Sequence, residues 1–118
     1  MTINSGRGFT LVEIMIVVAI IAIALSIAIP NYLTMSQTSK RTVCINNLKK
    51  IAGAVEQYVI ESNIDVGTKL SSAQEDEVYS KYIRGGVPTC PSGGQYTIET
   101  IGSSPQVICT KEGEGHTL

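Results

Sequence analysis

Apolar residues fill one early stretch of the chain completely and then recur at helical spacing in the next. From Phe9 to Ile29 the sequence is FTLVEIMIVVAIIAIALSIAI, in which Glu13 is the one charged residue. An α-helix of this length measures roughly 30 Å, which matches the hydrocarbon core of a bilayer. We therefore predict a helix that is apolar on every side and able to span a membrane.

From Lys40 onward the apolar pattern becomes one-sided. Apolar residues recur every three or four positions with polar residues between them, so we expect the helix to continue in amphipathic form to about Glu61. Pro30 cannot donate a hydrogen bond to the carbonyl of Ser26, and a kink or a local loss of helix is expected there. The residues expected on the buried stripe are Cys44, Leu48, Ile51, Ala52, Val55, Tyr58 and Val59.

Residues 62–118 are predicted to form a small head that packs on this stripe. Residues 63–69 have loop composition, and Ser71 or Ser72 can cap a short helix that Gly85-Gly86 ends. Alternation within residues 95–101 and 106–110 predicts an antiparallel hairpin, with a third strand left open. The fold class is therefore α+β. The apolar side of the short helix is expected to comprise Val78, Tyr79, Tyr82 and Ile83.

The residues before the apolar run are not those of an ordinary secretory signal. MTINSGRG is short and polar, and the apolar run follows Gly8 instead of preceding a small-residue cleavage site. Gly8-Phe9-Thr10-Leu11-Val12-Glu13, with Pro30-Asn31-Tyr32 beyond the run, resembles the type IV prepilin family, which includes the type II secretion pseudopilins. The resemblance implies a pilin-like fold, cleavage after Gly8 by a prepilin peptidase and N-methylation of Phe9.

The same resemblance implies an organisation and a place in the cell. Residues 1–8 would be the leader, residues 9–61 the long helix and residues 62–118 the head. The precursor would lie in the bacterial inner membrane with its head outside the cytoplasm. An assembly machinery would then polymerise it into a helical homo-oligomeric filament at the cell surface or in the periplasm. The segment preceding Pro30 can lose helical structure in assembled filaments of the family.

Glu13 matches the family glutamate that engages the N-terminal amine of a neighbouring subunit. A carboxylate within a membrane segment costs about 2.5–3.5 kcal/mol on insertion scales. Cleavage before Phe9 would create an α-amine with a pKa near 8. An ion pair at about 4 Å and an effective dielectric constant near 20 gains roughly 4 kcal/mol, which is comparable to that cost. A paired Glu13 can therefore stay buried.

Three functions are consistent with these features. The first is a pilus-like filament subunit. We favour it because the head is short and lacks the calcium-site pattern that the family resemblance would imply, in a loop near the end, for a major secretion pseudopilin. The second is the major pseudopilin of a type II secretion system. A more distant alternative is a membrane-anchored, exported binding domain. None of the three is an enzyme, and the sequence holds no catalytic constellation and implies no cofactor.

Three cysteines, two of them in the small head, favour an oxidising exterior but leave one unpaired. Cys90 and Cys109 flank the predicted hairpin and form the preferred disulfide, while Cys44 is either free or an alternative partner for one of them. Together with His116 these residues include the donors of a Cys₃His zinc site. No two cysteines have the C-x₂₋₄-C spacing, however, so we assign no metal site.

Charge adds little to this interpretation. The net charge of the 118 residues is −1, and their number allows one domain. Lys40, Arg41, Lys49 and Lys50 form a basic stripe that could touch DNA, but a solvated or subunit-facing stripe is favoured. The acids of residues 75–77 suit the first turns of a helix better than a calcium site.

Overall fold

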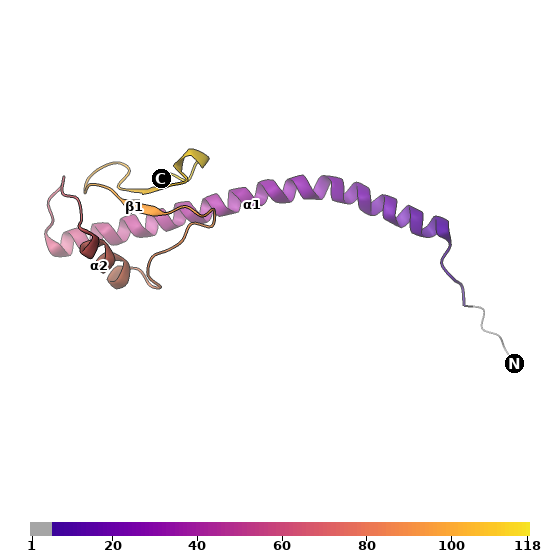
Figure 1. Ribbon diagram of the computed structural model, residues 1–118, viewed down its shortest axis with the longest axis horizontal. Coiled ribbons are helices and arrows are strands. Elements are labelled where there is room, and N and C mark those ends of the chain that lie inside the picture. The colour runs from indigo at the N-terminus through magenta and orange to yellow at the C-terminus, as the bar shows by residue number, and fades with distance from the viewer. Residues whose placement is uncertain (1–5) are drawn as a thin grey trace. The chain divides into compact units, whose positions relative to one another are not determined.

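The computed structural model describes residues 6–118 (Figure 1). Residues 1–5, which belong to the predicted leader, lie outside the described residues. The chain divides into two units, Met1–Ser36 and Gln37–Leu118, and the long helix α1 contributes to both. The elements are α1 (Leu11–Ser62), α2 (Ser72–Tyr82), β1 (Tyr96–Ile98), β2 (Val107–Cys109) and the 3₁₀ turn η1 (Glu112–Glu114).

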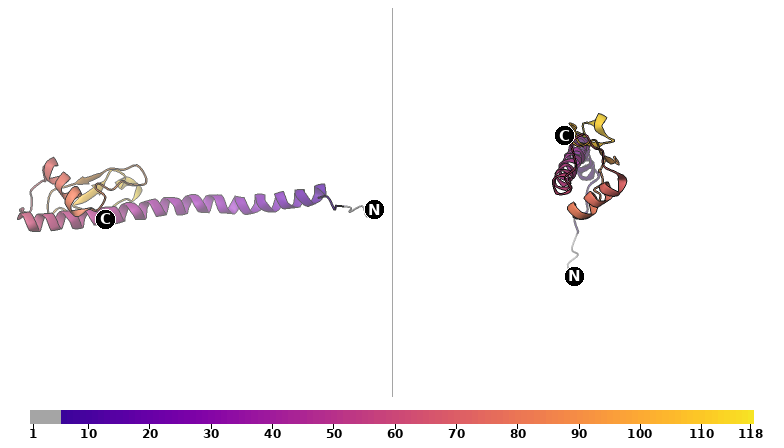
Figure 2. Two further views of the ribbon diagram at one scale, coloured as in Figure 1. Left: turned by 90° about the horizontal axis from the view of Figure 1, so that it is seen from below. Right: turned by 90° about the vertical axis from the view of Figure 1, so that its left-hand side faces the viewer.

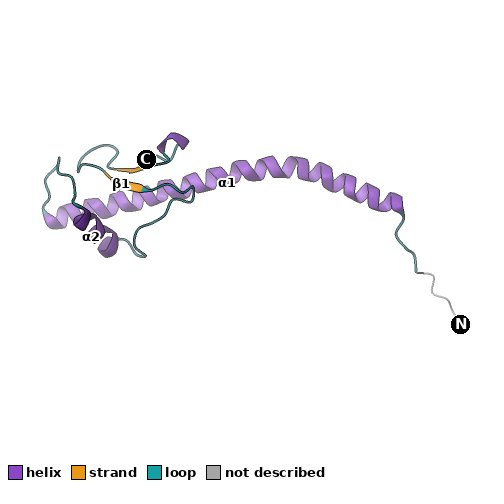
Figure 3. Cartoon of the chain, in the orientation of Figure 1, coloured by secondary structure: helices purple, strands orange, loops and turns teal. Residues whose placement is uncertain are grey.

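The N-terminal unit is the first part of α1, and its helix is unbroken at Pro30 (Figure 3). The local loss of helix expected near this proline does not occur in the single chain. A proline removes one backbone hydrogen bond, and the bonds of the turns on either side are enough to hold the helix together. The hydroxyl of Thr34 donates to the carbonyl of Pro30 at 3.2 Å, one turn further along.

The head, Gln37–Leu118, has its core on one side of the C-terminal part of α1. Figure 2 shows α2 and the strands together on this side of the helix. The stripe is confirmed at Cys44, Leu48, Ile51, Val55 and Tyr58, and α1 also buries Ala54, which the predicted stripe did not include. Ala52 and Val59 are only half-buried at its margin. Apolar burial against this stripe is the main source of the head's stability.

Helix α2 begins where its capping residues predict. Ser71 is the N-cap, and its backbone N–H donates to Oε1 of Gln74 at 2.9 Å, which satisfies one of the free donors at the helix start. Val78 and Tyr79 are buried in the core of the head, as expected. The chain leaves the helix through Gly85 and Gly86, whose φ angles of 96° and 77° suit residues without a side chain.

The hairpin is confirmed but is shorter than its sequence pattern suggested. Strands β1 and β2 are antiparallel and three residues long, with Tyr96 opposite Cys109 and Ile98 opposite Val107. They form a two-stranded sheet, and the described residues contain no third strand. The loop after α1 pairs with the hairpin instead, through the N–H of Gly67 to the carbonyl of Ile101 at 2.8 Å. The α+β, pilin-like class is therefore confirmed.

Candidate functional site

Helix α1 starts in a reciprocal cap built from Thr10 and Glu13. The N–H of Thr10 donates to Oε2 of Glu13, and the N–H of Glu13 donates to Oγ1 of Thr10, each at 3.3 Å. This is a capping box, in which two residues three positions apart satisfy each other's backbone donors. The Thr-x-x-Glu spacing carries the signal for it in the sequence, although the prediction considered Glu13 only as an ion-pair partner.

The residues that precede the cap are open to solvent. Gly8 and Phe9 form an extended segment ahead of α1, and the Phe9 side chain is 82% exposed. Nothing lies within 4 Å of the position that a side chain on Gly8 would occupy. The peptide bond between these two residues is therefore accessible to a peptidase in the single chain.

The apolar surface of α1 is uncovered over its first turns. Every large apolar side chain from Phe9 to Ile29 is at least 48% exposed. Among the described residues, α1 is long and apolar enough to cross a membrane. Soluble monomers rarely expose so large a continuous apolar surface. The segment must therefore be covered by lipid or by other helices.

The polar side chain in the middle of this segment is compatible with such a cover. The hydroxyl of Ser26 donates to the carbonyl of Ile23 at 2.7 Å, so it needs no outside partner. A hydroxyl bonded to its own helix in this way can be tolerated in hydrocarbon. Glu13 is then the residue in the segment whose charge still calls for a partner from outside the helix.

A second group of residues meets inside the head. The sulfur atoms of Cys44, Cys90 and Cys109 and a ring nitrogen of His116 all lie within 4.8 Å of one another. The sulfur of Cys90 and Nδ1 of His116 are 3.5 Å apart. All four residues are buried, and the three cysteines are not bonded to each other. The predicted Cys90–Cys109 disulfide therefore stays a prediction, as does the role of Cys44 as a free thiol or alternative partner.

The segments around the cluster bring these residues together. Cys44 projects from α1 and Cys109 from the end of β2. Cys90 starts a turn in which the N–H of Gly93 donates to the carbonyl of Cys90 at 2.9 Å. The C-terminal tail, which has no periodicity in the sequence, returns to α1. Nε of Arg41 donates to the carbonyl of Gly115 at 2.8 Å and so holds the neighbouring His116 in place.

The surroundings of Cys44 and Cys90 shift the pKa values of these two thiols in opposite directions. Burial raises the pKa of Cys44 to about 12, although the hydroxyl of Tyr96 acts against this. Burial also acts to raise the pKa of Cys90, but hydrogen bonds from the N–H groups of Ser92 and Gly94, helped by Cys44 and His116, outweigh it and lower the pKa to about 6. The surroundings of Cys90 therefore favour the thiolate form of its side chain.

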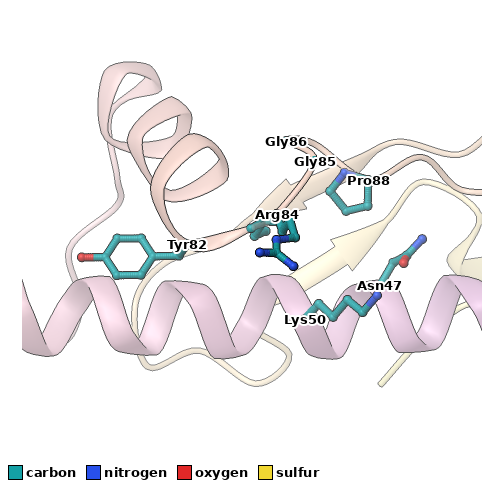
Figure 4. Close-up of a pocket in the computed structure, with 8 residues that line it drawn as sticks. Asn47, Lys50, Tyr82, Arg84, Gly85, Gly86 and Pro88 are labelled. Atoms are coloured by element: carbon teal, nitrogen blue, oxygen red, sulfur yellow. The ribbon is translucent and has the colours of Figure 1, made fainter.

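A hollow of about 360 Å³ lies elsewhere in the head, between α1 and the segment after α2 (Figure 4). Its charged lining residues are Lys50 and Arg84, and no acidic side chain lines it. The hollow therefore suits an anionic group. Its lining includes neither metal-binding carboxylates nor a nucleophile paired with a base.

Comparison with known proteins identifies the family. The prokaryotic N-terminal methylation motif matches residues 3–29. The chain is also 30% identical to the type II secretion system core protein G of Klebsiella pneumoniae over 111 residues, which cover 86% of this chain and 79% of that protein. The chain belongs to the family of type IV pilins and type II secretion pseudopilins.

Two pilins match a shorter part of the chain. The type IV major pilin protein PilA of Myxococcus xanthus is 46% identical over 58 residues, which are 49% of this chain and 26% of that protein. A fimbrial protein of Pseudomonas aeruginosa is 40% identical over 58 residues, or 49% of this chain and 38% of its own length. No solved structure matches the chain.

Membership in this family gives meaning to the N-terminal site. Gly8, Phe9 and Glu13 all lie within the matched methylation motif, and the exposed helix that follows them is the part of the chain that most needs a cover. The cysteine and histidine cluster lies outside that motif. The sequence offered these four residues as possible zinc donors, but their spacing gave no support for a site because they come from four separate segments.

Proposed function

We propose that this protein is the structural subunit of a type IV pilus-like filament, cleaved after Gly8, N-methylated at Phe9 and polymerised through α1. The observation that carries this proposal is the uncovered apolar surface from Phe9 to Ile29. Exposing this surface to water would cost about 25 cal/mol for each Å², so once the subunit leaves the bilayer a bundle of equivalent helices would have to cover it. The role is mechanical, with no catalytic step.

Glu13 would set the axial position of each subunit. In the single chain its carboxylate accepts a hydrogen bond from Thr10 at 3.3 Å, a long contact that a stronger partner can displace. The α-amine of a neighbouring Phe9 would be such a partner. An ion pair gains energy only near one relative height of two helices, whereas apolar packing tolerates sliding. The apolar surface would thus drive assembly, and Glu13 would select its register.

The membrane would hold the subunit before assembly. The exposed apolar helix and the kinship with pilins and pseudopilins support a membrane-anchored precursor in the inner membrane, with the head on the outer side. Prepilin peptidase and a pilus assembly machinery are the partners this role requires. Four basic residues of α1 are exposed and would face solvent or neighbouring subunits rather than DNA. They are Lys40, Arg41, Lys49 and Lys50.

The second candidate is the major pseudopilin of a type II secretion system. The longer alignment supports it, because the similarity to the Klebsiella core protein G spans 86% of this chain, whereas that to the Myxococcus pilin spans 49%. Both candidates share the cleavage, the methylation and the helical assembly. They differ in whether the filament leaves the cell, so the location of the mature protein separates them.

The test is the intact mass of the protein in sheared material and in membranes from native cells. A mass that begins at Phe9 with one added methyl group, found in the sheared fraction, is the result expected for a pilus subunit. The same processed mass confined to the membrane would favour the pseudopilin. A chain that still begins at Met1 in both fractions would refute processing and revive the anchored binding domain.

A further inference from the structure

Four buried side chains of the head have no part in the proposed filament role. They are the three cysteines and His116, whose sulfur and ring nitrogen atoms lie within 4.8 Å of one another. We propose that Cys44, Cys90, Cys109 and His116 bind one zinc ion in tetrahedral coordination. The ion would be structural, because four protein ligands leave no position open for a substrate.

The separations of the donor atoms suit such an ion. With Zn–S bonds of about 2.3 Å and a Zn–N bond of about 2.0 Å, the donors of a tetrahedral site are about 3.5–3.8 Å apart. The sulfur of Cys90 and Nδ1 of His116 already stand at 3.5 Å. The widest separation, 4.8 Å, would have to shrink by about 1 Å. Side-chain torsions alone can provide a movement of this size.

The chemistry of the four groups points to zinc among the common metals. Thiolates with an imidazole suit zinc, whereas calcium and magnesium take oxygen ligands. His116 is the one buried polar or charged side chain among the described residues, and it is 3% exposed. A thiol is a weak hydrogen-bond partner for an imidazole, so burial beside three sulfurs has little purpose without a metal.

Hydrogen bonds around the cluster would orient and stabilise the ligands. The N–H groups of Ser92 and Gly94 donate to the sulfur of Cys90, and the hydroxyl of Tyr96 is hydrogen-bonded to the sulfur of Cys44. Nδ2 of Asn47 in turn donates to the Tyr96 oxygen at 3.1 Å. Outer partners of this kind favour the charged, metal-binding form of a thiol and fix its direction.

The absence of a side chain at Gly94 lets the backbone lie close to the sulfur of Cys109. A Cβ on Gly94 would stand 2.7 Å from the sulfur of Cys109, closer than any real contact allows. The backbone of the Cys90 turn therefore lies directly against the cluster. A residue with a side chain at this position would push Cys109 away from the other ligands.

The ion would join four separate parts of the head. Cys44 lies on α1, Cys90 in the turn before the hairpin, Cys109 at the end of β2 and His116 in the tail. A disulfide can link only two of these parts. A head this small has a limited core and usually needs such a link. Zinc that binds only the folded head would add its binding free energy to folding.

The first experiment measures metal in the full chain, purified from membranes in detergent with a reductant and without a chelator. Elemental analysis should find about one zinc per chain. After exchange with Co²⁺, the protein should show the visible absorption of tetrahedral cobalt with thiolate ligands. The cysteines should resist alkylation until a chelator removes the metal. These measurements use the wild-type protein and do not depend on whether a variant folds.

Variants then locate the ion. Cys109→Ser and His116→Ala should lose it or bind it far more weakly. Tyr96→Phe removes an outer hydrogen bond and should lower zinc affinity about 10- to 100-fold while the ligands remain. Asp76→Asn is the matched control, because it removes an exposed acid that could bind metal adventitiously. This control should keep the full metal content.

Three results would overturn the proposal. The first is reduced wild-type protein that holds no zinc and shows no cobalt spectrum. The second is a disulfide between any two of the three cysteines in protein alkylated at cell lysis, before any reductant is added, because a bonded sulfur is no longer a zinc ligand. The third is zinc that persists in both ligand variants and is lost with Asp76→Asn.

Discussion

Truncating two isoleucines of the same helix to alanine should affect different properties, the stability of the head in one case and filament yield in the other. Ile51 is 0% exposed in the core of the head, whereas Ile29 is 56% exposed near the end of the apolar segment. Both lie in α1, so replacement by alanine has a similar effect on helix propensity at each. The difference between the two variants therefore reports tertiary burial alone.

The expected loss for Ile51→Ala is large relative to the stability of a small head. Truncating a fully buried isoleucine to alanine costs about 2–5 kcal/mol, the sum of lost transfer free energy and the cavity that remains. A domain of 60–100 residues changes its Tm by about 4–8 °C per kcal/mol, so the Tm should fall by at least about 8 °C. Ile29→Ala should change the free energy of unfolding of the head by less than about 0.5 kcal/mol.

The assay is thermal unfolding of the full chain in detergent, followed by near-UV circular dichroism. The signal reports the head, since Tyr58 and Tyr79 are in its core. Filament yield after shearing is measured for both variants in cells. Ile29→Ala should lower the yield without changing the Tm. Equal Tm losses in the two variants, or a normal yield from Ile29→Ala, would refute the assignment of one helix to two separate tasks.

Three further predictions test other residues. Glu13→Gln should leave cleavage intact and lower filament yield about tenfold or more, since the ion pair is lost; the control Glu112→Gln, an exposed acid of the head, should assemble normally. The hydrogen bond to Glu61 raises the pKa of Tyr82 to about 12, so absorbance titration of Glu61→Gln should show this pKa return toward 10.0. Because the folded-state pKa is the raised one, the stability from this bond is complete below pH 10 and disappears as the pH rises toward about 12. Gly94→Ala should lower the free energy of unfolding by about 1–3 kcal/mol, because the added methyl group would overpack against the sulfur of Cys109. Gly53→Ala is the control and should be neutral or stabilising, because no atom lies within 4 Å of the added methyl group. Equal effects of the two substitutions would contradict the close contact between Gly94 and Cys109.

The two proposals for this protein concern different units and can fail independently. Filament assembly depends on the uncovered apolar surface of the N-terminal unit and on Glu13. Zinc binding depends on four side chains of the head. A head stapled by zinc would need no disulfide to withstand an exterior environment, and its thiolates would be protected by the ion. Loss of zinc should therefore affect the stability of the subunit before it affects processing at Gly8.

Local patterns in the sequence were sufficient for most of the fold. An unbroken apolar run can only be a helix in lipid or among other helices, and a stripe at every third or fourth position can only bury one side. The start of α2 at Ser71 and its end before Gly85 follow from capping and from φ angles that glycine adopts at no cost. The methylation motif around Gly8 and Glu13 identified the family for the same reason, since its residues are contiguous.

Tertiary structure decided what depends on residues far apart in the chain. The loop after α1 pairs with the hairpin at Gly67 and Ile101, beyond the ends of the three-residue strands, and no local pattern reveals this pairing. Cys44, Cys90, Cys109 and His116 are brought together by the packing of a helix, a turn, a strand and a tail. Spacing rules describe metal ligands that share one short loop. A site assembled by the closure of the whole head has no such spacing, so only the folded chain could place its four donors within reach of one ion.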